Sequence, residues 1–227
     1  MLKKLFLSIQ ENKKDWKGFG EGKHLEDKLV TELRKIGFTR LDKEELEKKE
    51  SEKWEKLKEK VKGNELISNE FPDWTSKGFV YSPYGSQKYP DFLIFTNKYI
   101  IPLEAKSSTK EGTKPMWNSH LPKINGLYIF ASFGKEDITF FRGADVIDED
   151  LSNKLIGFFE KARKTEEEFV KDLEKDNKSE RGWKPYIRIA YDQVKSLLLP
   201  QGKLDYFEHP RREEIEKSVL KWLENIA

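Results

Sequence analysis

The chain has 227 residues, of which 36% are hydrophobic and 37% charged, so it is polar for a globular protein but long enough for one large domain. It contains no cysteine and three histidines, which excludes disulfides, thiol nucleophiles and cysteine-based zinc sites. Any metal would therefore be held mainly by oxygen ligands. The net charge of +2 gives no overall nucleic-acid signal. No run approaches the roughly 18 to 20 apolar residues that cross a bilayer, and the N-terminal apolar run is too short for a secretion signal, so we expect a cytoplasmic protein.

The first third of the chain predicts helices. After a polar lead-in, Leu25, Leu29, Leu33 and Ile36 recur at helical spacing before Gly37, which predicts an amphipathic helix that stops at the glycine.

The segment 41–62 is nearly all charge with sparse apolar residues, and it predicts a solvated helix. A plain surface helix is one interpretation of this segment. An arm that contacts DNA or a second subunit is the other.

The middle of the chain predicts a sheet. Two apolar runs, 91–95 and 99–106, are separated by Thr96-Asn97-Lys98, which indicates a β-hairpin. After a polar loop, 126–134 and 138–147 both indicate strands, the first buried on both faces. The expected fold class is α/β (α+β), with a central mixed sheet of four or more strands flanked by helices.

The last third returns to helical patterns. Residues 149–177 predict a helix, 184–194 either a strand or a short helix, and 213–226 a closing helix with one apolar face. We find no internal repeat and no linker that would separate two domains. We therefore expect a single domain over residues 1–227.

The hairpin register decides which side chains meet. Counting back from the turn places Asp91 opposite Leu103 or Glu104, and directly opposed side chains on one face lie about 5 Å apart at Cβ. Because side chains alternate along a strand, Glu104 and Lys106 should face a cleft while Leu103 and Ala105 face the core.

Pro102 lies inside the second strand of this hairpin. Because proline cannot donate to a ladder, we expect the strand to be bulged or unpaired there, which could shift the register.

Hydrolysis of a phosphodiester requires charge neutralisation at the phosphate and an activated water. Two carboxylates that hold a divalent ion beside a lysine provide both. The alternative is a structural ion pair of Lys106 with Glu104 or Asp91, because unpaired buried charges are costly.

The segments YPDFLIF and YIIPLEAK resemble the motif of the PD-(D/E)XK nucleases, with Pro90-Asp91 as the PD and Glu104-Ala105-Lys106 as the (D/E)XK. The tripeptide alone carries no weight, because an acid, any residue and a lysine occur in that order seven times. A second Pro-Asp lies at 72–73. Only the Glu104 copy ends an apolar β run, and only Asp91 begins one in the same hairpin.

The resemblance covers about residues 20–147 and implies a magnesium-dependent DNA endonuclease that leaves 5′-phosphate ends. It implies that Asp91 and Glu104 bind Mg²⁺, with the Leu103 carbonyl as an additional ligand, and that Lys106 orients or helps to deprotonate the attacking water. Glu26, on the helix before the hairpin, is a candidate for a further acid near the metal; a plain surface position is the equal alternative. Calcium should support binding without cutting.

Polar loops on both sides of the presumed site supply candidate DNA contacts. Trp117 is also a candidate core residue and Asn118 a turn cap. Candidates for base edges are Gln87, Lys88, Asn118 and His120, for stacking Trp117, and for phosphates Lys110, Lys114, Arg181, Lys184, Arg188, Arg211 and Arg212.

Within that superfamily the chain most resembles a type II restriction endonuclease, which implies a homodimer on a palindromic double-stranded DNA site. The segment 41–62 and the closing helix are candidates for the dimer interface or for arms around DNA. Two alternatives remain open: a structure-specific nuclease of the junction-resolving or repair type, and a non-catalytic DNA-binding protein of the same fold.

Overall fold

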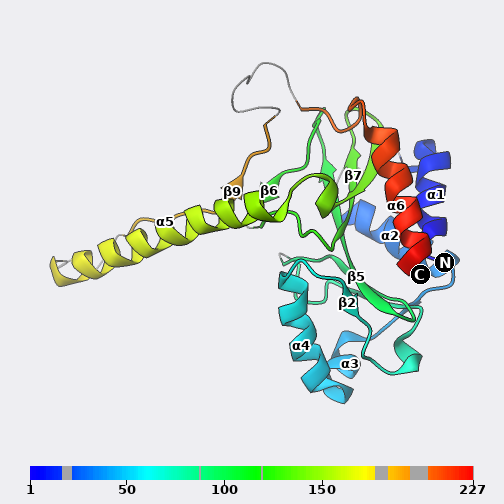
Figure 1. Ribbon diagram of the computed structural model, residues 1–227, viewed down its shortest axis with the longest axis horizontal. Coiled ribbons are helices and arrows are strands. Elements are labelled where there is room, and N and C mark those ends of the chain that lie inside the picture. The colour runs from blue at the N-terminus through cyan, green and yellow to red at the C-terminus, as the bar shows by residue number, and fades with distance from the viewer. Residues whose placement is uncertain (17–21, 87, 119, 177–183, 195–203, 227) are drawn as a thin grey trace.

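The computed structural model describes residues 1–16, 22–86, 88–118, 120–176, 184–194 and 204–226. It confirms the predicted fold class, because a mixed sheet of seven strands in these residues is flanked by helices (Figure 1). None of the helices in the described segments is long and apolar enough to span a membrane.

The sheet is built around one long strand, β5 (Tyr99–Ser108). It runs antiparallel to β4 (Phe92–Phe95) on one side and parallel to β7 (Leu127–Ser132) on the other, which makes the sheet mixed. The strand order is β1-β3-β4-β5-β7-β8, and β2 also pairs with β5. The other strands of this sheet are β1 (Thr39–Arg40), β2 (Ile67–Ser68), β3 (Gly78–Tyr81) and β8 (Asp137–Arg142).

The predicted hairpin is present, but the bulge expected at Pro102 is absent. The register runs without a break from Phe95 opposite Ile100 to Phe92 opposite Leu103, with Leu93 opposite Pro102. Pro102 falls between the part of β5 that pairs with β2 and the part that pairs with β7. Pro102, which has no backbone N–H to donate, thus lies where the second neighbour of β5 changes from β2 to β7.

Three helices cover one face of the sheet: α1 (Lys3–Glu11), α2 (Gly22–Lys35) and α6 (Arg212–Ile226). The expectation of a polar lead-in was wrong for α1, because Leu5, Phe6 and Ile9 are fully buried. The α6 face carrying Val219 and Leu223 is buried in the same core, so it is not free to form the dimer interface considered above.

On the opposite face, the charged segment forms two helices, α3 (Lys43–Lys49) and α4 (Ser51–Lys62), rather than one. Glu50 leaves helical geometry between them, with φ −130° and ψ 42°. These helices are solvated on one side only. Leu46, Trp54, Leu57 and Val61 are buried against strand residues of β3, β4 and β5.

A separate aromatic cluster covers the β7–β8 half of that same face. Different groups of side chains therefore cover the two halves. Between the two clusters lies Tyr89, which packs against both. The sheet face is consequently divided near β5. The cluster consists of Trp117, Tyr128, Phe130, Phe141 and Phe207.

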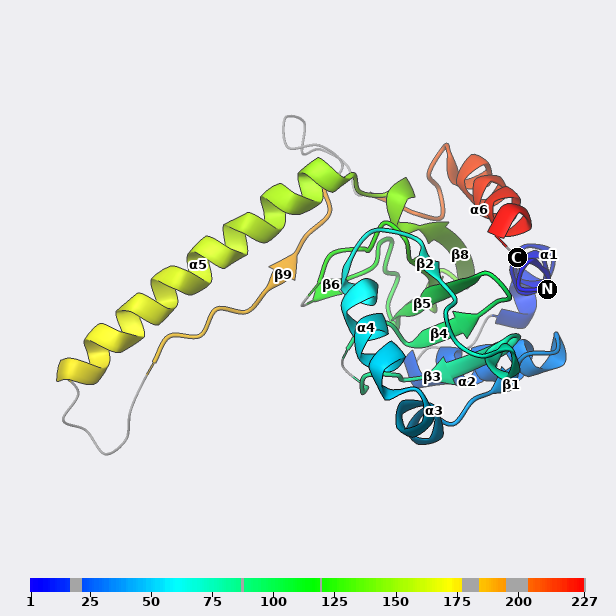
Figure 2. The same ribbon diagram turned by 60° about the horizontal axis from the view of Figure 1, so that its bottom comes forward.

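The predicted helix 149–177 corresponds to α5 (Glu149–Asp176), which projects from the body as an arm (Figures 1 and 2). Its 28 residues span about 42 Å. Residues 184–194 return beside it and end in β9 (Ala190–Tyr191), which pairs with β6 (Trp117–Asn118). The strand alternative for 184–194 is therefore right only for two residues.

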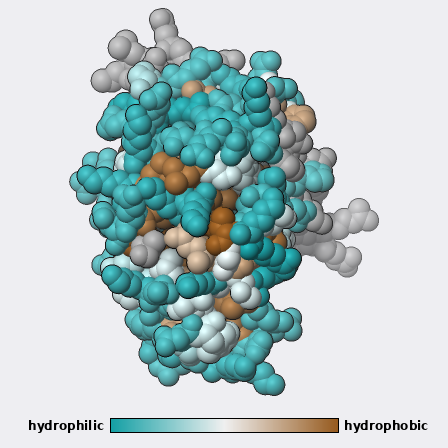
Figure 3. Space-filling view, turned by 90° about the vertical axis from the view of Figure 1, so that its right-hand side faces the viewer, coloured by the Kyte–Doolittle hydropathy of each residue, from teal (hydrophilic) through white to brown (hydrophobic). Residues whose placement is uncertain are grey.

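Short 3-10 helices complete the fold: η1 (Lys13–Trp16), η2 (Asp73–Thr75) and η3 (Gly143–Asp145). Seen from the side of α1 and α6, the surface is mostly hydrophilic, with apolar side chains in a limited central area (Figure 3). This agrees with the high charge content of the sequence.

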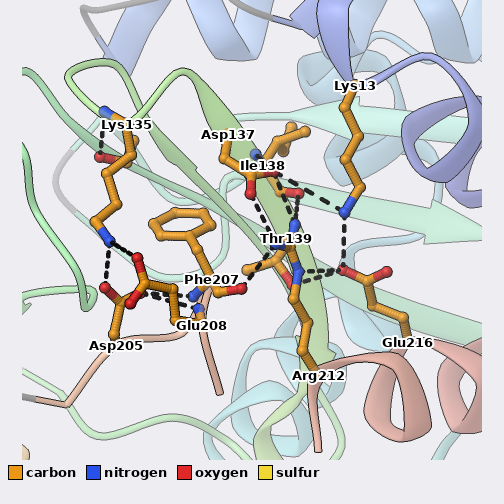
Figure 4. A network of polar contacts seen from close by, with 11 residues as sticks. Lys13, Lys135, Asp137, Ile138, Thr139, Asp205, Phe207, Glu208, Arg212 and Glu216 are labelled. Atoms are coloured by element: carbon orange, nitrogen blue, oxygen red, sulfur yellow. Dashed lines mark hydrogen bonds and ion pairs between the residues drawn. The ribbon is translucent and has the colours of Figure 1, made fainter. Parts of the chain in front are cut away.

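A buried ion network joins α6 to β8 (Figure 4). Arg212 donates to both carboxylate oxygens of Asp137 at 2.7 and 2.8 Å and to Glu216 at 3.1 Å. Glu216 is only 2% exposed and also accepts from the Thr139 hydroxyl. Arg212 is thus occupied within the fold, which corrects its assignment as a phosphate contact.

Replacing Arg212 with Ala should lower the free energy of unfolding by about 3 kcal/mol, because it leaves Glu216 and Asp137 without their main cation. Urea denaturation measures this change. Arg211→Ala is the matched control, since Arg211 pairs with Glu214 in solvent, and its midpoint should stay close to wild type. Equal losses in the two variants would contradict the structural role of the network.

Candidate active site

The three residues of the presumed site line one cavity of about 380 Å³ at the divided sheet face. Leu103 and Ala105 face the helix-covered core, while Glu104 and Lys106 face the cavity, as alternation along β5 requires. Arg188 comes from the segment that returns along the arm. The full lining is Ser86, Lys88, Tyr89, Asp91, Glu104, Ala105, Lys106, Asn118, His120 and Arg188.

Asp91 and Glu104 are each held by the other's strand. The Asp91 backbone N–H donates to Glu104 Oε2 at 3.1 Å, and the Ala105 backbone N–H donates to Asp91 Oδ2 at 2.8 Å. Phe92 opposite Leu103 fixes this register, so Asp91 lies beside Glu104. The strand pairing itself therefore brings two acids together.

Two basic side chains adjoin Glu104. Lys106 Nζ lies 2.7 Å from Glu104 Oε1, and His120 Nε2 lies 3.7 Å from the same oxygen. Lys106 also lies over the ring of Trp117, 5.8 Å from its centroid. The ion pair between Lys106 and Glu104 is one that the structural alternative predicts, and it borders a cavity.

The two acids differ in proton affinity. Burial, followed by the nearby Glu104 charge, raises the pKa of Asp91 to about 8. Burial also acts to raise the pKa of Glu104, but contacts with His120 and Lys106 outweigh it, so the pKa of Glu104 is lowered. Glu104, which is paired with Lys106, therefore holds its negative charge more readily than Asp91 does.

Glu26 lies outside the lining of this cavity. Its carboxylate accepts a hydrogen bond of 2.5 Å from the Tyr81 hydroxyl on β3. Its charge still contributes to raising the pKa of Asp91, which places it near the site. Glu26 is thus a neighbour of the candidate metal ligands without sharing their cavity.

The candidate DNA contacts separate into groups. Lys88, Asn118, His120 and Arg188 line the cavity, whereas Lys110 and Lys114 do not.

Lys114 is bound to Asp192 and to the Gln193 carbonyl. Arg211 pairs with Glu214. Lys184 lies along the arm. Gln87 and Arg181 lie outside the described residues.

Trp117 is 3% exposed and packs edge-on against Tyr128, so its interpretation as a wedge between bases is wrong and the core alternative is right. Like Ser86, Tyr89 lines the cavity but was not among the residues predicted from the sequence. Its aromatic character alone gave no signal, because its position depends on the junction of two side-chain clusters.

The donor set fits a magnesium ion. Across the described segments, no group of three or more His, Asp or Glu side chains is placed to hold a metal, so a cation here would have two carboxylates as side-chain ligands. Mg²⁺ commonly binds one or two carboxylates and completes its shell with water and substrate phosphate oxygens. A cation would also offset the burial and the Glu104 charge that together raise the pKa of Asp91. Leu103, the expected carbonyl ligand, does not line the cavity.

Comparisons of the chain with protein-family models, with curated proteins and with solved structures found no match.

Replacing Asp91 with Asn should stabilise the metal-free protein at pH 7.5 by at least about 1.4 kcal/mol, the free energy of one pKa unit. The folded pKa of Asp91 lies above its unfolded value of 3.8, so its stabilising contribution is complete below that pH and is lost as the pH rises towards about 8. Urea unfolding in EDTA measures the difference. A variant equally or less stable than wild type at pH 7.5 would contradict this charge balance.

Proposed function

We propose that this chain is a magnesium-dependent endonuclease of the PD-(D/E)XK type that hydrolyses phosphodiester bonds of double-stranded DNA and leaves 5′-phosphate ends. The observation that carries the proposal is the common cavity of Asp91, Glu104 and Lys106. These residues come from two paired strands in the order that the motif requires.

Each residue has a defined task under this proposal. Asp91 and Glu104 would hold the Mg²⁺, which supplies positive charge to the phosphate oxygens when bound. Glu104 fixes Lys106 through their 2.7 Å contact, so the amine stays at the cavity surface where it can orient the attacking water. The His120 imidazole lies 3.7 Å from the Glu104 oxygen that Lys106 also contacts.

Double-stranded DNA is the proposed substrate because the cavity walls carry groups suited to phosphates and base edges. Arg188 and Lys88 provide cations, and Asn118 provides an amide. These polar groups support sequence-specific cleavage of the type II restriction kind. A junction-resolving or repair nuclease and a non-catalytic DNA-binding protein are the competing assignments.

We further propose that the protein cuts as a homodimer, since each chain presents one such cavity among its described residues and a double-strand break needs two. The apolar faces of α3, α4 and α6 are used inside the chain. The arm is the better candidate for the dimer contact, because Phe158 and Phe169 on α5 are 63% and 53% exposed.

Digestion of a sequenced plasmid with Mg²⁺ tests the proposal. Discrete fragments with 5′-phosphate ends are expected, whereas cleavage confined to branched DNA would assign a resolvase. Asp91→Ala and Lys106→Ala should each slow cutting by at least about 100-fold, because they remove a metal ligand and the group beside the water.

Two control variants match these substitutions. Asp73→Ala alters the second Pro-Asp pair, which lies exposed in η2, and Lys49→Ala alters another acid-x-lysine copy, on α3. Both should cut at the wild-type rate. Folded Asp91 and Lys106 variants with undiminished cleavage would overturn the assignment, and a wild-type protein that binds DNA without cutting would support the non-catalytic alternative.

A further inference from the structure

A second cavity, of about 560 Å³, adjoins the candidate active site. It lies beside α4, and it shares Lys88, Tyr89 and His120 with the catalytic cavity. The two cavities therefore lie next to each other, and we call the second one the lysine groove. Its lining is Lys43, Lys58, Glu59, Val61, Lys62, Pro83, Tyr84, Lys88, Tyr89, His120 and Lys123.

The lysine groove is strongly unbalanced in charge, because five lysines and one glutamate line it. Lys58 and Lys62 have carboxylate partners on their own segment of the chain. Within the described segments, Lys43, Lys88 and Lys123 have no ion-pair partner. Three positive charges are thus available to an anion from outside the chain.

The fold holds Lys123 in the groove, which contributes to the excess of positive charge there. Its backbone N–H donates to the Tyr128 hydroxyl at 2.7 Å, and its carbonyl accepts from Gly126 at 2.9 Å. Gly143 leaves room for that carbonyl, because a Cβ there would lie 2.0 Å away. Burial lowers the pKa of the Lys123 amine, and no acid compensates for it. A half-buried amine held without a counter-charge is costly unless an anion binds there.

The groove also has aromatic side chains in its walls. Tyr84 and Tyr89 line it, and the buried Tyr84 hydroxyl has no hydrogen-bond partner in the part of the chain that the structure describes. A positive groove with aromatic walls suits a nucleic-acid strand, whose backbone is anionic and whose bases stack.

We propose that the lysine groove binds the phosphate backbone of the DNA strand that enters the catalytic cavity, with Lys43 and Lys123 as its principal phosphate contacts. This inference rests on the proposed nuclease function, and it extends the substrate path from Asp91 and Glu104 towards α4. A polymer fits better than a small anion, because Lys43, Lys88 and Lys123 line a groove that adjoins the presumed cutting site.

The arm is a poorer path for DNA. Its helix α5 carries nine acidic and six basic side chains, whereas the groove has a clear surplus of lysine. Non-specific DNA affinity comes mainly from neutralised phosphates, so the groove is the surface with the required charge.

The test compares two double variants that remove equal charge. The double variant Lys43→Gln with Lys123→Gln removes two positive charges from the groove. The control, Lys48→Gln with Lys56→Gln, removes two exposed lysines of α3 and α4 that lie outside the groove. Fluorescence anisotropy measures binding of a labelled duplex in Ca²⁺ at several salt concentrations, and circular dichroism verifies folding. The groove variant should reduce the slope of log K against log salt by about 2, and the control should not.

The outcomes separate this inference from the proposed function. If the two double variants show equal slopes, or if the wild-type protein binds no duplex, the groove assignment is overturned. If the groove variant loses slope while the wild-type protein fails to cut in Mg²⁺, the groove is supported and the nuclease assignment fails.

Discussion

The antiparallel pairing of β4 with β5 is the constraint on which the account of this protein depends. It places Asp91 beside Glu104 and uses the backbone N–H of each strand to hold the acid of the other. Burial, followed by the neighbouring Glu104 charge, raises the pKa of Asp91. A fold that retains such a pair beside an open cavity is organised for a cation or for a proton, and we favour the cation.

The rest of the molecule leaves that pair accessible. One face of the sheet is covered by α1, α2 and α6, and the other is divided between α3–α4 and the aromatic cluster around Trp117. The cavity of the candidate active site lies on this face, between α3–α4 and the aromatic cluster. The arm returns Arg188 to one wall, and the lysine groove continues from the other. Acidic and basic groups are thus segregated at short range, although the net charge of the chain is only +2.

Local patterns in the sequence were sufficient for the hairpin, the helix α2 and the alternation of Leu103, Glu104, Ala105 and Lys106, because each depends on spacing within one element. Properties set by distant contacts were not predictable. The burial of Trp117, the capture of Arg212 by Asp137 and Glu216, and the return of Arg188 to the cavity all join segments far apart in the chain. The helix α1 was missed because it is short and its buried residues Leu5, Phe6 and Ile9 pack against elements far away in the chain.

The central claim is that Asp91 and Glu104 form a divalent-cation site beside Lys106. The most direct measurement is an anomalous difference map from crystals of the protein soaked in MnCl₂. We expect a peak within about 2.6 Å of an oxygen of each carboxylate, the outer range for oxygen ligands of hard cations. A well-ordered cavity with no peak between these two acids would contradict the account.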